Sequence, residues 1–104
     1  MKWLYLILAG LFEIGFTTSM KFSEGFTKWQ GIVGFFIFGG LSFWLLLKSM
    51  QSIEMGTAYA VWAGIGASGT VLMGAILFND SISWTKLLFL FLIIVGIIGI
   101  KLSA

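Results

Sequence analysis

Four long hydrophobic segments alternate with short polar ones along the sequence. The hydrophobic segments cover residues 3–20, 31–47, 55–78 and 84–102, and each is near the length of about 20 residues that a helix needs to cross a bilayer. They are unbroken, whereas the strands of a membrane barrel alternate apolar and polar residues. The pattern therefore predicts an all-α integral membrane protein with four transmembrane helices in a single domain, residues 1–104.

The composition agrees with a membrane protein and argues against an enzyme. Hydrophobic residues make up 60% of the sequence and charged residues 10%, and the mean hydropathy is +1.09. Cysteine and histidine are absent from the sequence, which excludes disulfides, thiolate chemistry and the imidazole ligands of zinc. The four acidic residues are scattered, so we expect no metal site and no cofactor. The net charge of +2 is spread too widely for a nucleic-acid-binding patch.

Glu13 lies well inside the first hydrophobic segment, where a carboxylate would sit at membrane depth. Ionisable groups are costly in hydrocarbon and usually line an internal site or pathway, so Glu13 is a candidate for binding protons or cations. A proton and an organic cation would each neutralise this charge. The two would therefore compete for one carboxylate, which is the basis of antiport. The alternative is a structural glutamate that only hydrogen-bonds another helix.

Helical spacing places Gly10, Phe16 and Thr17 on the same face as Glu13. Gly10 either lets another helix approach closely or leaves room for a substrate, and the Thr17 hydroxyl can form a hydrogen bond within a pocket. Phe16 offers an apolar ring for stacking. These three residues are therefore candidates for the substrate site.

Aromatic residues supply a second group of candidates. Tyr59 and Trp62 are three residues apart in the third segment, so their rings share a face and can bind a cation. The alternative for this pair is packing, or the aromatic belt that forms at membrane surfaces. We expect the other aromatic residues, including Phe43, Trp44 and the Phe35–Phe36 pair, to serve packing or lipid contact.

The lysines favour neither orientation in the membrane, although positive loops normally mark the cytoplasmic side. Three lie on the side of the termini and three on the opposite side: Lys2, Lys48 and Lys101 against Lys21, Lys28 and Lys86. A chain without bias can insert both ways, and two copies of opposite orientation can form an antiparallel dimer. Alternatively, the amino terminus sets one orientation despite this balance.

Three stretches of the sequence resemble the small multidrug resistance family of the drug and metabolite transporter superfamily. They are AGLFE (residues 9–13), TTSMKFSEGF (17–26) and GTAYAVWAGIG (56–66). The resemblance extends over essentially the whole chain. It implies a multi-pass protein of the bacterial inner (plasma) membrane that works as an antiparallel homodimer. It further implies exchange of protons for small organic cations, with Glu13 of both protomers at a shared site.

The resemblance also implies roles for individual residues. It assigns Tyr59 and Trp62 to the substrate site, and it makes Ser42 a serine near the carboxylate that can hydrogen-bond Glu13. From the sequence alone, a bond from Ser42 to its own helix is the favoured interpretation.

Glycines are frequent in the third and fourth segments. The resemblance implies that Gly64 and Gly66 form a hinge, at which the third helix bends as the site alternates between membrane faces. Each glycine weakens a helix by about 1 kcal/mol relative to alanine, so bending would cost little. The alternative, close helix contact through small residues, is compatible with a hinge. We expect Gly96 and Gly99 to serve close contact.

Substrate preference is the least determined property. Residues 17–26 resemble the multidrug, quaternary ammonium branch of the family, whereas residues 64–69 and 98–101 resemble the guanidinium-exporting branch or paired subunits. Guanidinium exporters typically carry tryptophan where this chain has Phe16, which lacks the indole N–H. We therefore expect a proton-coupled exporter of quaternary ammonium ions. The alternatives are a guanidinium exporter, one subunit of a heterodimer, or a membrane protein without transport activity, such as a regulatory or holin-like protein.

Overall fold

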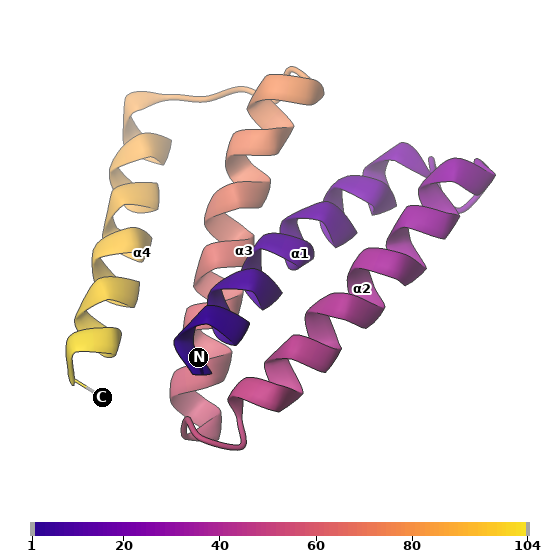
Figure 1. Ribbon diagram of the computed structural model, residues 1–104. Coiled ribbons are helices and arrows are strands. Elements are labelled where there is room, and N and C mark those ends of the chain that lie inside the picture. The colour runs from indigo at the N-terminus through magenta and orange to yellow at the C-terminus, as the bar shows by residue number, and fades with distance from the viewer. Residues whose placement is uncertain (1, 104) are drawn as a thin grey trace.

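The computed structural model describes residues 2–103, which form four α-helices joined by short connections (Figure 1). The helices are α1 (Lys2–Phe22), α2 (Trp29–Ser49), α3 (Met55–Leu77) and α4 (Trp84–Ser103). Their ends differ from the predicted limits by at most two residues. The predicted all-α architecture with four helices is confirmed.

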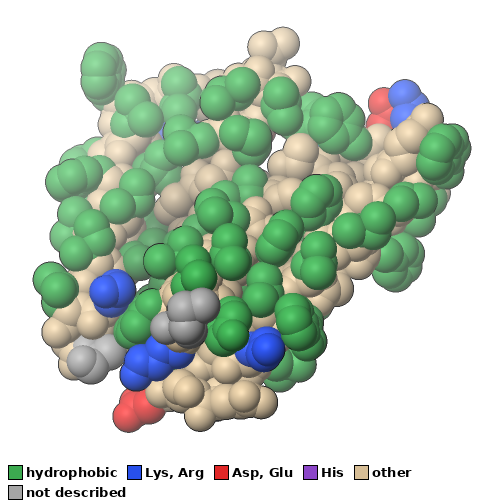
Figure 2. Space-filling model, viewed as in Figure 1, with side chains coloured by type: hydrophobic (Ala, Val, Ile, Leu, Met, Phe, Trp, Pro, Cys, Tyr) green, Lys and Arg blue, Asp and Glu red, His purple; other side chains and the backbone are tan. Residues whose placement is uncertain are grey.

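All four helices are long and apolar enough to cross a membrane. A helix of about 20 residues spans about 30 Å, the thickness of the hydrocarbon core of a bilayer. Hydrophobic side chains cover the face shown in Figure 2, and charged side chains lie toward its ends. This distribution fits contact with lipid along the sides of the helices and contact with water at their ends.

The first three helices pack together, and α4 is attached to one side of them. α1 contacts both α2 and α3, while α4 packs mainly on α3 (Figure 1). Near the end of α4, Lys101 Nζ also lies 5.2 Å from the ring centroid of Trp3 in α1. The start of α1, the α2–α3 connection and the end of α4 lie at one end of the molecule. The other two connections lie at the opposite end, as four successive membrane crossings require.

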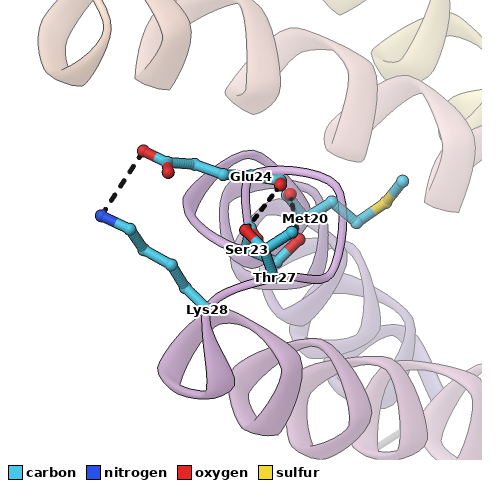
Figure 3. A network of polar contacts seen from close by, with 5 residues as sticks. All are labelled: Met20, Ser23, Glu24, Thr27 and Lys28. Atoms are coloured by element: carbon cyan, nitrogen blue, oxygen red, sulfur yellow. Dashed lines mark hydrogen bonds and ion pairs between the residues drawn. The ribbon is translucent and has the colours of Figure 1, made fainter.

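The connection between α1 and α2 is a tight turn held by hydroxyl groups (Figure 3). Ser23 Oγ donates to the Met20 carbonyl oxygen (2.7 Å), and Thr27 Oγ1 donates to the Glu24 carbonyl oxygen (2.9 Å). Lys28 Nζ lies 3.5 Å from Glu24 Oε1, an exposed ion pair worth at most about 1 kcal/mol. The hydroxyl groups satisfy carbonyls near the end of α1 that have no helical partner, which holds α1 and α2 as a hairpin.

The fourth helix turns most of its apolar surface away from the other helices. Leu90 is the only buried residue of α4 in the part of the chain that the structure describes. A methyl group added at Gly96 or Gly99 would meet no atom within 4 Å among residues 2–103. The close contact expected at these two glycines is therefore not made within the protomer. Both glycines instead line a cavity within the protomer, together with Trp3 of α1 and Thr57 of α3.

Candidate functional site

Glu13 projects from the middle of α1 onto the glycine surface of α3. A methyl group added at Gly66 would overlap the carboxylate of Glu13, so the two residues lie in direct contact. Glu13 Oε2 is buried and has no hydrogen-bond partner among the described residues. A buried oxygen without a partner is costly, and in native proteins it usually marks a place for water, an ion or a ligand. Glu13 thus holds an unused acceptor inside the helix bundle.

Ser42 joins α1, α2 and α3 through two hydrogen bonds. Its hydroxyl donates to the carbonyl oxygen of Ala9 (2.7 Å) and accepts a bond from Trp62 Nε1 (2.9 Å). Neither of the bonds expected for Ser42, to its own helix or to Glu13, forms among residues 2–103. The reason is that its side chain points across the helix interface, where the Ala9 carbonyl oxygen accepts its hydrogen bond. Because Ala9 is one turn before Glu13, Ser42 positions the backbone beside the carboxylate rather than the carboxylate itself.

An aromatic group extends from α3 to α2. The rings of Tyr59 and Trp62 lie side by side on α3 as their spacing predicts, with centroids 5.6 Å apart. Trp62 is 9% exposed and Tyr59 57% exposed, so the tyrosine ring is open to a ligand or a second chain. The ring of Phe43 lies 5.7 Å from that of Trp62 and 6.0 Å from that of Phe16. Phe43, which we expected only to pack or to contact lipid, therefore links the two predicted groups of aromatic residues.

Phe16 faces α2 and not the contact between Glu13 and α3. Its ring centroid lies 4.6 Å from that of Phe35, and a methyl group at Gly39 would lie 2.8 Å from the Phe16 ring. The half-buried Phe16 side chain thus takes part in packing between α1 and α2. Its membership in the substrate site stays a prediction.

Gly10 and Thr17 both face α3, one turn to either side of Glu13. A methyl group at Gly10 would lie 2.7 Å from Ile65 Cβ, so the glycine allows close approach of α3 and is not beside open space. Thr17 Oγ1 lies 2.7 Å from Thr70 Oγ1, a hydrogen bond between the two helices. Thr70 was missed by the sequence analysis, although it lies four residues after Gly66 and so shares that face of α3.

The proposed hinge glycines serve helix contact in this conformation. α3 runs without a break through Gly64 and Gly66. The side chain of Ile97 in α4 packs on Gly64, where a methyl group would lie 2.6 Å from Ile97 Cδ1, and the Glu13 carboxylate lies on Gly66. Close contact through small residues is confirmed. Bending of α3 at these glycines stays a prediction.

The arrangement suits reversible binding of a small cation or a proton. Glu13 is the only acidic residue within helices α1 to α4, and no group of three acidic side chains gathers among the described residues. The carboxylate itself lies against Gly66, and the hydroxyl pair of Thr17 and Thr70 is one helical turn away. One buried carboxylate with an unused oxygen is therefore the chemical centre of the site.

Comparison with known proteins identifies the family of the chain. The sequence matches the family described as Small Multidrug Resistance protein over residues 1–93. It is 41% identical to the guanidinium exporter of Yersinia pseudotuberculosis over 104 residues, which is the full length of both proteins.

Two further relatives carry the same name. The guanidinium exporter of Salmonella typhimurium is 40% identical over 104 residues, covering 100% of this chain and 99% of that protein. That of Citrobacter freundii is 41% identical over 103 residues, covering 99% and 98%. With four apolar helices of membrane-spanning length, the chain is a multi-pass membrane protein that belongs to the small multidrug resistance family of transporters.

Proposed function

We propose that the protein exports guanidinium, or a similar planar cation rich in N–H donors, in exchange for protons. The names of the relatives support this substrate class. The structural observation that carries the proposal is the buried, unpartnered Oε2 of Glu13. A guanidinium ion presents parallel N–H donors whose spacing matches the two oxygens of a carboxylate, which makes this pairing stronger than contact with a point charge.

Exchange with protons follows from the shortage of acidic groups inside the bundle. Glu13 is the one acidic side chain within helices α1 to α4, so a cation and a proton have the same binding group there. An unneutralised carboxylate at membrane depth is costly. This cost opposes a change of the site from one membrane face to the other while it is empty. Export of one cation therefore requires entry of a proton at the same carboxylate.

We further propose an antiparallel homodimer in the bacterial inner (plasma) membrane as the working unit. The bacterial sources of the relatives support this location. The exposed apolar surface of α4, which includes Leu88, Leu92 and Val95, can be covered by the same surface of a second copy. A dimer would also bring two Glu13 carboxylates and two Tyr59 rings to one site. Pairing with a different related chain is the alternative.

Quaternary ammonium ions of the multidrug type are the second candidate substrate class. The sequence favours this class because Phe16 lacks the indole N–H of the tryptophan that guanidinium exporters typically carry. In the structure the rings of Phe35 and Phe43 lie beside Phe16, and such an apolar surface suits apolar cations. The names of the relatives support guanidinium better. We therefore rank the quaternary ammonium ions second and keep them as the comparison in the test below.

A panel of cations tests the proposal on the purified protein in liposomes with a pH gradient. Guanidinium is expected to drive proton movement at least about tenfold more efficiently than tetramethylammonium, since only guanidinium forms charge-assisted hydrogen bonds with the carboxylate. Liposomes without protein provide the background. A preference for every quaternary ammonium tested over guanidinium would reverse our ranking.

The lysine balance predicts that the protein inserts in both orientations. Lys2, Lys48 and Lys101 lie at the start of α1, the end of α2 and the end of α4, and the three other lysines lie at or next to the opposite helix ends. Tags on the carboxyl terminus are therefore expected on both sides of the membrane in comparable amounts. Two lysines added to the terminal side should bias insertion and lower activity. If more than about nine in ten wild-type chains share one orientation, the antiparallel homodimer is wrong.

A further inference from the structure

A pair of threonine hydroxyls bridges α1 and α3 next to the carboxylate. Thr17 is one turn after Glu13 in α1, and Thr70 is one turn after Gly66 in α3, so the bridge lies beside the contact between Glu13 and Gly66. Both threonines are half-buried. The bridge is thus the next polar contact along the helix interface from Glu13.

Hydrogen-bond donors can be assigned within this bridge. The Thr17 hydroxyl lies 3.2 Å from the Glu13 carbonyl oxygen and 3.1 Å from the Ile14 carbonyl oxygen, and both carbonyls can only accept. Either hydroxyl could donate across the 2.7 Å contact, and the arrangement that uses every contact has Thr17 donating to a carbonyl oxygen and Thr70 donating to Thr17. Thr70 Oγ1 then has lone pairs that accept no hydrogen bond among the described residues.

A cavity begins at this bridge and extends toward the α3–α4 connection. It has a volume of about 420 Å³ and is lined at its inner end by Thr17, Thr18 and Thr70. Asp80 and Lys21 line it farther out, together with Phe78, whose ring centroid lies 6.0 Å from Lys21 Nζ. The cavity therefore connects one end of the molecule with the hydroxyl pair that adjoins Glu13.

The charged groups of this cavity oppose each other in their effect on a cation. Asp80 attracts a cation and Lys21 repels it, and neither side chain forms an ion pair within residues 2–103. The two charges leave little net attraction, so the hydroxyl oxygens are what can distinguish one cation from another. This suits passage of a cation better than its storage.

From these contacts we infer that Thr70 is a specificity-determining residue: its hydroxyl accepts an N–H bond from a donor-rich cation passing between the cavity and Glu13. The inference rests on the proposed function and adds a second point of selection to it. A passing cation must separate the Thr17–Thr70 bridge. Guanidinium replaces the lost hydrogen bond with its own N–H, whereas a fully alkylated cation cannot, so the bridge favours guanidinium.

Two substitutions of Thr70 test this role. Thr70→Val keeps the side-chain shape and removes the hydroxyl, and Thr70→Ser keeps the hydroxyl. Initial transport rates are measured for guanidinium and for hexamethylguanidinium, in which methyl groups replace all of the N–H donors. We expect the preference for guanidinium to fall about tenfold in Thr70→Val and to stay within about twofold of wild type in Thr70→Ser.

Thr57→Val is the matched control. Thr57 belongs to the same helix as Thr70, but it lies outside this cavity and lines a different one. The preference of Thr57→Val for guanidinium should equal that of wild type.

Three outcomes overturn the inference. An unchanged preference in Thr70→Val refutes it, and so does an equal loss of transport for both cations, which would indicate a structural role. If the wild-type protein carries no guanidinium, the proposed function itself fails, and the inference fails with it.

Discussion

Replacing Glu13 with glutamine is expected to reduce cation-driven proton exchange to the background of empty liposomes. Glutamine keeps the size of the side chain but cannot exchange a proton or neutralise a cation, so both ligands lose their shared group. The variant should still insert and fold, because Glu13 Oε2 makes no hydrogen bond among residues 2–103 that would be lost. The measurement is guanidinium-driven proton movement in liposomes. Glu13→Asp should retain exchange with a different dependence on pH.

Glu54→Gln is the matched control for this experiment. Glu54 is an exposed carboxylate at the start of α3 whose side chain forms no capping hydrogen bond. Its replacement removes the same charge outside the bundle and should leave exchange within about twofold of wild type. Wild-type rates in Glu13→Gln would show that the carboxylate is not the coupling group.

Gly66→Ala is expected to weaken guanidinium binding by at least about tenfold. The added methyl group would overlap the Glu13 carboxylate, which must move away from its place against α3. Overpacking of this kind typically costs about 1–3 kcal/mol. Alanine favours a helix by about 1 kcal/mol over glycine, so the helix itself should not be harmed. The measurement is the equilibrium dissociation constant for guanidinium by calorimetry on the purified protein.

Gly40→Ala controls for the substitution itself, because a methyl group there meets no atom within 4 Å among the described residues. The experiment also separates two roles of Gly66. Displacement of the carboxylate weakens binding, whereas loss of a hinge slows transport with binding intact. Normal binding in Gly66→Ala would therefore contradict our account of this contact and favour the hinge.

The sequence was sufficient to predict the helices because each is a long apolar segment bounded by polar residues. Contacts between residues of the same helix could also be predicted from the sequence. The pairing of Tyr59 with Trp62 requires only the helical repeat, and the structure has their rings 5.6 Å apart.

Contacts between helices could not be predicted, because they depend on how one helix slides and rotates against the next. Residues on nearly every side of these helices are apolar, so the pattern does not mark which face is turned inward. Ser42 illustrates this limit: its position near Ala9 and Trp62 is set by the packing of three helices. The bridge between Thr17 and Thr70 joins residues far apart in the sequence and depends on the same packing.

Glycine positions show a related limit. Sequence reasoning identified the glycines of α3 as places of close contact or bending, yet it could not say that Gly66 receives the Glu13 carboxylate. It likewise could not distinguish Gly64, which packs on α4, from Gly96, which faces open space in the protomer. A glycine in a helix indicates that another group can come close to the backbone, but it does not identify that group.

Release of protons on addition of guanidinium to the purified, detergent-solubilised protein tests the central claim most directly. If proton and cation compete for Glu13, guanidinium should release protons in a saturable manner in weakly buffered solution, and Glu13→Gln should release none. Wild-type protein that binds guanidinium without releasing protons, or equal release from Glu13→Gln, would contradict exchange at this carboxylate.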